Sequence, residues 1–238
     1  MNTEEKVQEE NYFNFRNVAA DYYSGYDIPN YLMKVLPQNL DANILDIGCG
    51  FGQTLKSLRD KGYKNLKGVD INDESIAQCK KINLDVTKVD DIIFYATTSH
   101  KKYDFIIMSH VLEHIEKEKM IDNLRAIKSL LREKGKYCVM VPNAQSNTGS
   151  YWRFEDFTHH YLFTAGSLQY VLRAAGFTQI DFIDPEGLDG VSSLKKPIVK
   201  ILLKIYKFRK NFWNKITASS YHRPSPQIFT FELKALAS

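Results

Sequence analysis

The chain has 238 residues, of which 44% are hydrophobic and 25% charged, and its formal net charge is +4 at pH 7. This length suits one α/β domain with additions and excludes two large domains, while the absence of a long apolar run excludes a membrane-spanning segment. The isolated cysteines Cys49, Cys79 and Cys138 have no metal-binding or redox spacing, so we expect reduced thiols in a cytoplasmic protein without a structural metal.

In chain order, residues 1–8 are polar and acidic, and we expect them to be disordered rather than a signal peptide. The aromatic-rich segment 12–36 is predicted to form one or two helices over the mouth of a sheet, which makes residues 1–40 an N-terminal helical cap. Strands and helices then alternate, a pattern that predicts a mostly parallel sheet with helices on both faces, an α/β fold. The predicted strands cover residues 43–47, 65–69, 84–89, 103–108 and 137–141, and the predicted helices cover 53–61, 73–81 and 117–131.

After Pro142 the chain becomes polar and aromatic, and residues 143–160 are predicted to be a loop. A helix over 165–175 and a strand over 177–183 follow. An insertion at about 184–226 then precedes a last, half-buried strand at 227–233. This late pair of strands predicts an antiparallel edge to the sheet of the main domain, 41–238.

The most informative stretch is Asp46-Ile47-Gly48-Cys49-Gly50-Phe51-Gly52, a strand end that runs into a glycine loop. A strand, a glycine loop and a helix start together form a nucleotide-type pocket at the carboxyl edge of a parallel sheet. Asp46 would oppose a phosphate but would suit a cationic ligand. Asp70 ends the second strand about 20 residues later, where a carboxylate can accept from ribose hydroxyls. Asp90 and Asp91 follow the third strand, where they can accept from an adenine amine.

A nicotinamide dehydrogenase is the main rival for this loop. Gln53 stands where the third glycine of the GxGxxG pattern would fall, so hydride transfer is disfavoured. A non-catalytic binding module with the same fold remains an alternative, because a fold does not fix a function.

Four segments in this order resemble the class I S-adenosylmethionine-dependent methyltransferases. They are residues 44–52, 68–71 (Gly-Val-Asp-Ile), 103–115 (Tyr-Asp-Phe-Ile-Ile-Met-Ser-His-Val-Leu-Glu-His-Ile) and 168–177. The resemblance covers about residues 43–182 and implies a Rossmann-like sheet of seven strands, with the last strand antiparallel, and S-adenosyl-L-methionine as the cofactor. The cofactor-binding residues that it implies are Asp46, Gly48, Cys49, Gly50, Gly52, Asp70, Ile71, Asp90, Asp91, Ser109 and His110.

Within the third segment, His110 and His114 are four residues apart, as in a zinc-binding helix. The zinc pattern HExxH needs a glutamate directly after the first histidine, but Val111 stands there and the carboxylate is Glu113. We therefore expect no metal. His110 is a candidate for a base or an acceptor contact, whereas His114 is expected to be structural.

The segment Tyr151 to Thr164 is expected to form the substrate wall. It contains two histidines, and an imidazole can take a proton from a hydroxyl as the methyl group arrives. The candidate catalytic residues are therefore His159, His160 and His110, although a histidine here could also only pack against the next helix. The candidate substrate-binding residues are Tyr151, Trp152, Arg153 and Asn143. Arg153 either holds a phosphate or carboxylate or pairs with a surface acid.

The insertion is basic and amphipathic. Residues 190–231 contain no acidic residue and nine lysines and arginines, interleaved with apolar side chains around 194–215. Three interpretations stay open: a solvated lysine face, peripheral contact with an anionic membrane, and an electropositive lid over a phosphate-bearing substrate. No nucleic-acid-reading motif accompanies the charge, so nucleic acid is not expected as a partner.

The sequence thus predicts methyl transfer to an oxygen of a small polar acceptor. Residues 141–147 and the Tyr-Trp-Arg segment are similar to methyltransferases of bacterial surface polysaccharides, which favours a sugar, a nucleotide sugar or a phosphate-containing precursor. The alternatives are another acceptor class, such as a quinone or an amine, and a non-catalytic module that binds a membrane or a partner through its basic helix.

Overall fold

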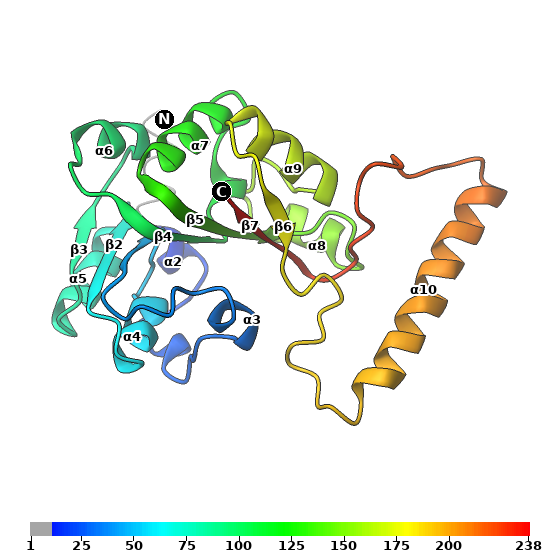
Figure 1. The fold of residues 1–238 in the computed structure, drawn as a ribbon, viewed down its shortest axis with the longest axis horizontal. Coiled ribbons are helices and arrows are strands. Elements are labelled where there is room, and N and C mark those ends of the chain that lie inside the picture. The colour runs from blue at the N-terminus through cyan, green and yellow to red at the C-terminus, as the bar shows by residue number, and fades with distance from the viewer. Residues whose placement is uncertain (1–10) are drawn as a thin grey trace.

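The computed structural model describes residues 11–238, so the expectation for residues 1–8 lies outside the described part. Its strands are β1 (Asn43–Ile47), β2 (Asn65–Asp70), β3 (Val86–Lys88), β4 (Tyr103–Ser109), β5 (Leu131–Pro142), β6 (Ile180–Phe182) and β7 (Glu232–Ala237). They form one sheet in the order β3-β2-β1-β4-β5-β7-β6 (Figure 1). β7 is antiparallel to β5 and β6, and the pairs among β1 to β5 are parallel. The predicted seven-stranded fold is confirmed.

Helices cover both faces of the sheet (Figure 1). On one face lie α6 (Ile92–Thr98), α7 (Met120–Ser129) and α9 (Ala165–Ala174). Leu124, Ile127 and Leu168 of these helices are fully buried in the larger core, together with Ile106 and Val139 of the central strands. Burial of such apolar side chains is the main favourable term in folding, so this layer anchors the carboxyl edge of the sheet.

The other face carries α3 (Asn30–Met33), α4 (Gln53–Asp60) and α5 (Asp73–Lys81) (Figure 1). Leu32 and Leu36 pack there with Ile44 of β1 and Phe105 of β4. The predicted helices over 12–36 are three short ones, which are α2 (Tyr12–Phe15), η1 (Ala20–Tyr23) and α3. The N-terminal segment is therefore continuous with the core beneath the central strands.

Two helices start where the sequence predicted none. α6 begins at Ile92 and is capped by Asp91, whose side chain accepts from the backbone N–H groups of Ile93 and Phe94. α8 (Gly149–Glu155) lies inside the segment that was predicted to be a loop. Both helices have seven residues, and helical periodicity over two turns is weak.

The last strand was predicted at 227–233, and this placement is wrong because the strand is β7, at Glu232–Ala237. The side chain of Asn143 accounts for the difference. Its Nδ2 donates to the carbonyls of Ile228 (2.8 Å) and Thr230 (2.9 Å). These bonds hold residues 228–230 beside the loop that follows β5 instead of in the sheet. Ile228 is nevertheless buried, so the alternation of polar and apolar residues over 227–233 indicated which side chains are buried but not where the strand pairs.

The basic insertion forms α10 (Lys196–Ile216), which lies away from the sheet (Figure 1). None of its residues is buried. Tyr206 ties it to the body, since its hydroxyl donates to Asn147 Oδ1 (2.7 Å) and its ring packs edge-on against Phe229. Within residues 11–238, every helix is too short or too polar to cross a bilayer.

Truncation of one leucine in the core and of one in α10 compares how much each part contributes to the free energy of unfolding. Leu124→Ala, at a fully buried site, is expected to lower the free energy of unfolding by about 2–5 kcal/mol, because it removes apolar contacts and leaves a cavity. The matched control Leu202→Ala, in α10 and 59% exposed, should change it by less than about 0.5 kcal/mol. Urea unfolding measures both variants, and equal losses would contradict this account of the core.

Candidate active site

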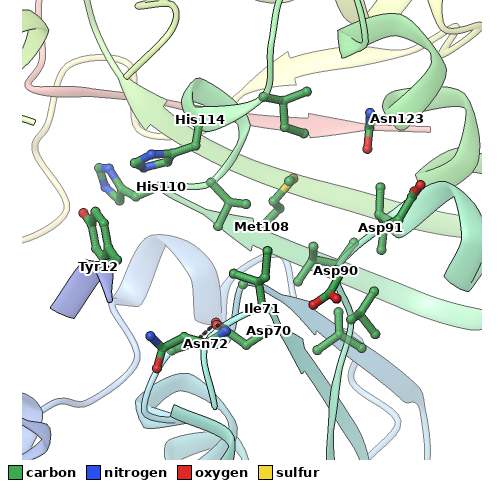
Figure 2. A pocket seen from close by; sticks show the side chains of 18 of the residues that line it. Tyr12, Asp70, Ile71, Asn72, Asp90, Asp91, Met108, His110, His114 and Asn123 are labelled. Atoms are coloured by element: carbon green, nitrogen blue, oxygen red, sulfur yellow. Dashed lines mark hydrogen bonds between the residues drawn. The ribbon is translucent and has the colours of Figure 1, made fainter. Parts of the chain in front are cut away.

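A cavity of about 400 Å³ opens at the carboxyl edge of the sheet. Figure 2 shows Asp70, Ile71 and Asp90 on one side of it, Met108 behind, and Tyr12, His110 and His114 on the other side. The predicted site residues that line it are Gly48, Gly50, Asp70, Ile71, Asp90, Asp91, His110 and His160. The fold thus gathers on one cavity side chains from segments as far apart as residues 12 and 160.

The glycine loop after β1 has left-handed backbone at all three glycines, with φ of +69°, +51° and +78° at Gly48, Gly50 and Gly52. A β-carbon at Gly48 would stand 2.2 Å from a Val111 methyl group, so only glycine lets these segments meet at the cavity. Gly52 serves packing instead, since it is the N-cap of α4 and abuts Leu84.

Cys49 was also predicted to bind the cofactor. Its side chain is buried in a separate apolar cluster that contains Leu55 and Ile76, so it does not form part of the cavity wall. All three cysteines are free thiols.

Asp70 holds the loop from the end of β2. Its Oδ2 accepts from the backbone N–H of Gly50 (2.7 Å) and its Oδ1 from that of Asn72 (2.8 Å). Burial raises the pKa of Asp70, and these two hydrogen bonds only partly counteract it. Each carboxylate oxygen has a second lone pair, so Asp70 can still accept from a pair of vicinal hydroxyls on a ligand in the cavity.

Asp46 lies one strand away and is 4% exposed. Burial, together with the nearby Asp70 carboxylate, raises the pKa of Asp46 to about 8. A cationic group beside these two acids would relieve the repulsion that causes part of this shift.

Asp90 and Asp91 both line the cavity, but they have different surroundings. Asp91 caps α6, with its Oδ1 2.7 Å from the backbone nitrogen of Ile93. Part of the hydrogen-bonding capacity of the Asp91 carboxylate is therefore already used by the helix start.

His110 follows β4 with a left-handed backbone (φ +54°). Its Nε2 lies 3.0 Å from Glu232 Oε2, and its Nδ1 lies 3.4 Å from Glu113 Oε1. Burial favours the neutral ring, but the two carboxylates outweigh it and raise the pKa of His110 to about 10. His110 is therefore a cation at neutral pH, which suits a contact to an acceptor better than proton abstraction. Ser109, the last residue of β4, does not line the cavity.

The two other candidate histidines differ in exposure. His159 is buried, and its Nδ1 lies 2.8 Å from the carbonyl oxygen of Trp152. His160 is exposed and lines the cavity. Of the pair, only His160 can therefore touch a ligand in the cavity directly.

The predicted substrate-binding residues flank the cavity without lining it. The Arg153 guanidinium donates to the carbonyl of His159, and Trp152 packs edge-on against Phe231 at 5.4 Å. Tyr151 is half-exposed beside Trp152. Asn143 is buried, and both ends of its side-chain amide already have hydrogen-bond partners. Its Nδ2 donates to the carbonyls of Ile228 and Thr230, and its Oδ1 accepts from the backbone N–H of Gln145, so its side chain is not available to a substrate.

Several residues at the site were not identified from the sequence. Tyr12 and Phe13 line the cavity, and Phe13 packs on Phe51 of the glycine loop at 4.4 Å. Their aromatic segment was predicted to cover the sheet, but no spacing singled out these two rings. Glu232 reaches His110 because β7 inserts beside β5, and no local pattern predicts that neighbourhood.

Comparison with known proteins was made for sequence and for fold. Residues 20–181 match a family described as "Methyltransferase domain". An uncharacterized protein of Methanocaldococcus jannaschii is 30% identical over 115 residues, which are 48% of this chain. The chain spans about half the length of that curated relative (47%).

Solved methyltransferases share the fold. A S-adenosylmethionine-dependent methyltransferase from Archaeoglobus fulgidus is 22% identical, with a TM-score of 0.65 over 95% of this chain and 98% of that one. The plantazolicin methyltransferase BamL, solved with a substrate analogue and S-adenosylhomocysteine, is 16% identical (TM-score 0.59, 98% and 95% covered). Magnesium protoporphyrin IX methyltransferase from Synechocystis, with S-adenosylhomocysteine bound, is 14% identical (TM-score 0.52, 92% and 82% covered).

The raised pKa of Asp46 makes the stability of the ligand-free protein depend on pH. The folded state favours the protonated acid, so the contribution of Asp46 is complete below pH ~4 and declines by up to about 1.4 kcal/mol per pH unit towards pH 8. Asp46→Asn removes this decline, and the variant should gain stability over the wild type as pH rises. Urea unfolding at several pH values measures the effect, with exposed Asp122→Asn as the control. Parallel curves for wild type and Asp46→Asn would contradict it.

Proposed function

We propose, from the premise that this chain belongs to the methyltransferase-domain family, that it methylates an oxygen of a small polar acceptor. The family match covers residues 20–181, and S-adenosylmethionine is the cofactor. The favoured acceptor class is a sugar, a nucleotide sugar or a phosphate-containing precursor of a bacterial surface polysaccharide.

The cavity fits this cofactor by its shape and charge. Gly50 has no side chain at the cavity wall, so a ligand can approach its backbone, and Asp70 offers acceptors for ribose hydroxyls. Asp70 lines the cavity and Asp46 is buried without lining it, and a cationic ligand beside them would favour the charged forms of both acids. When bound, the cofactor supplies a methyl group on a positively charged sulfur. The protein's part is to hold that group and the acceptor in line, which is where most of the rate enhancement would arise.

One observation supports this acceptor class, namely a row of rings that starts at His110 on the cavity wall and continues through Phe231, Trp152 and Tyr151. His110 stacks on Phe231 at 6.0 Å, Phe231 meets Trp152 at 5.4 Å, and Trp152 meets Tyr151 at 5.3 Å. Rings that alternate with polar tips suit a ligand with both apolar faces and hydroxyl groups, such as a sugar. A quinone with a long apolar tail would need an apolar channel instead.

A second hollow of about 400 Å³ supports a phosphate-bearing acceptor. Phe231 and Glu232 border it from the body, and Lys207 borders it from α10. It therefore adjoins the far side of the ring row. A sugar on the rings could extend an anionic group towards Lys207, which would give the basic helix a role in binding.

We propose that His160 contacts the acceptor, because it is exposed on the cavity wall. His160→Ala is expected to lower kcat/KM at least about 10-fold through lost positioning while the Kd of S-adenosylmethionine stays unchanged. Labelled cofactor with nucleotide sugars, quinols and amines in parallel measures the transfer, and exposed His222→Ala is the matched control. Transfer to quinols or amines alone, or a His160→Ala variant as active as the control, would contradict the proposal.

A second proposed role is peripheral binding of α10 to an anionic membrane. The helix has no buried residue, and Phe208, Phe212 and Trp213 are about half-exposed or more. Exposed aromatic side chains among lysines are typical of a helix that lies in a lipid interface.

Co-sedimentation with vesicles tests this role. Wild-type protein should bind vesicles that contain an anionic lipid, and Lys200→Glu/Lys204→Glu/Lys207→Glu should lose this binding, since each basic residue contributes about 1 kcal/mol near an anionic surface. A triple variant at lysines of the body, Lys56→Glu/Lys64→Glu/Lys101→Glu, is the control for net charge. Equal loss in both variants would show that only the overall charge matters.

A further inference from the structure

Three side chains meet beneath the cavity wall at a place that the function above does not use. They are Glu113 and His114, in the 3₁₀ turn η2 (Leu112–His114) after β4, and His159, after α8. One possible ligand atom of each lies within 4.8 Å of the other two. The Glu113 side chain is completely buried and that of His159 is 4% exposed, whereas His114 lines the cavity.

The hydrogen bonds fix which nitrogen of His159 carries a proton. A carbonyl oxygen only accepts, so Nδ1 of His159, 2.8 Å from the carbonyl of Trp152, must carry a proton, and a ring with a single proton has it there. Its Nε2 then has a lone pair, which lies 3.9 Å from Glu113 Oε1 and 3.6 Å from Asp156 Oδ2. These separations exceed the 2.7–2.9 Å that is typical of a charge-assisted hydrogen bond.

A similar argument applies to His114. The Thr158 hydroxyl donates its single proton to Asp156 Oδ1 (2.6 Å). Asp156 is the acceptor of this bond, since its Oδ2 also accepts from the Tyr12 hydroxyl (2.7 Å) and pairs with the Arg16 guanidinium (2.5 Å). Thr158 Oγ1 must therefore accept from Nδ1 of His114, 2.8 Å away, which leaves Nε2 of His114 with the lone pair.

Three electron-pair donors thus face one another within 4.8 Å. Within the described residues, neither oxygen of Glu113 has a hydrogen-bond partner. His110 Nδ1 stands 3.4 Å from Glu113 Oε1, farther than in a charge-assisted hydrogen bond, and His110 Nε2 lies 3.0 Å from Glu232. A buried carboxylate without a donor is costly, and a bound cation is one of the few arrangements that satisfies it.

We infer that Glu113, His114 and His159 form a binding site for a divalent transition-metal ion. Two imidazoles and one carboxylate suit Zn²⁺, Co²⁺ or Mn²⁺, whereas Mg²⁺ prefers an all-oxygen set. The bonds from His114 to Thr158 and from His159 to Trp152 are the outer contacts that orient metal-binding imidazoles. This differs from the expectation of no metal, because Glu113-His114 and His159 are 45 residues apart and share no motif.

The position of the site gives it a use that rests on the proposed function. His114 borders both the metal site and the cavity, and His110 and His160 border the cavity beside it. Three protein ligands leave a coordination position open. An acceptor hydroxyl at that position would be held beside the place that the resemblance assigns to the sulfonium.

Metal binding can be measured without cofactor or acceptor. The tag-free full chain, stripped with a chelator, is titrated with Co²⁺ and followed by calorimetry and by the visible absorption of the bound ion. One equivalent should bind, and excess Mg²⁺ should not displace it. Absence of binding, or equal binding of Mg²⁺, would overturn the inference. Methyl transfer is assayed separately, so the Co²⁺ titration still tests the metal site if the proposed acceptor class is wrong.

Variants test the ligand set. Glu113→Gln keeps nearly the same shape and should weaken Co²⁺ binding more than about 10-fold. Thr158→Val removes only the hydrogen bond that orients His114 and should weaken Co²⁺ binding about 10–100-fold. The matched controls are exposed Glu118→Gln, five residues further along, and His222→Ala, and both should bind as the wild type does. Unchanged cofactor affinity in Glu113→Gln shows that the fold is intact. Wild-type Co²⁺ affinity in Glu113→Gln would overturn the site.

Discussion

Two buried carboxylates at the ends of neighbouring parallel strands are the constraint on which the site depends. Asp46 and Asp70 face a loop whose backbone is left-handed at Gly48 and Gly50, and Asp70 fixes that loop through the Gly50 N–H. Burial raises the pKa of both acids, so the ligand-free protein disfavours their charged forms. An anionic ligand beside the two acids would raise their pKa values further, whereas a cationic ligand would favour their charged forms, which agrees with the proposed cofactor site.

The opposite side of the cavity is organised by carboxylates as well, but with histidines as partners. His110 is held between Glu113 and Glu232, and the same Glu113 faces His159 from below. One side of the cavity is thus acidic and the other is rich in imidazole. Under the proposed function, the acidic side would bind the cationic cofactor and the imidazole side would bind the acceptor.

Local patterns predicted where the glycine loop and the acids at the strand ends lie, because these features are encoded in consecutive residues. Asp70, about 20 residues after the loop, lies at its predicted place, since the length of a βα unit fixes where the next strand ends. The acceptor side depends on contacts between distant segments. Glu232 reaches His110 only because β7 lies between β5 and β6 in the sheet. The Asn143 side chain is occupied by hydrogen bonds to the segment before β7, because that segment passes beside it.

The central claim is that this cavity binds S-adenosylmethionine through Asp70, and calorimetric titration of the cofactor tests it most directly. Wild-type protein should bind at a single site. Asp70→Asn should bind about 10–100-fold more weakly, since hydrogen bonds to a charged group contribute about 1.5–3 kcal/mol, while Asp73→Asn, exposed on the first turn of α5, should bind as the wild type does. Absence of binding to the wild type, or equal affinity in Asp70→Asn, would contradict the account.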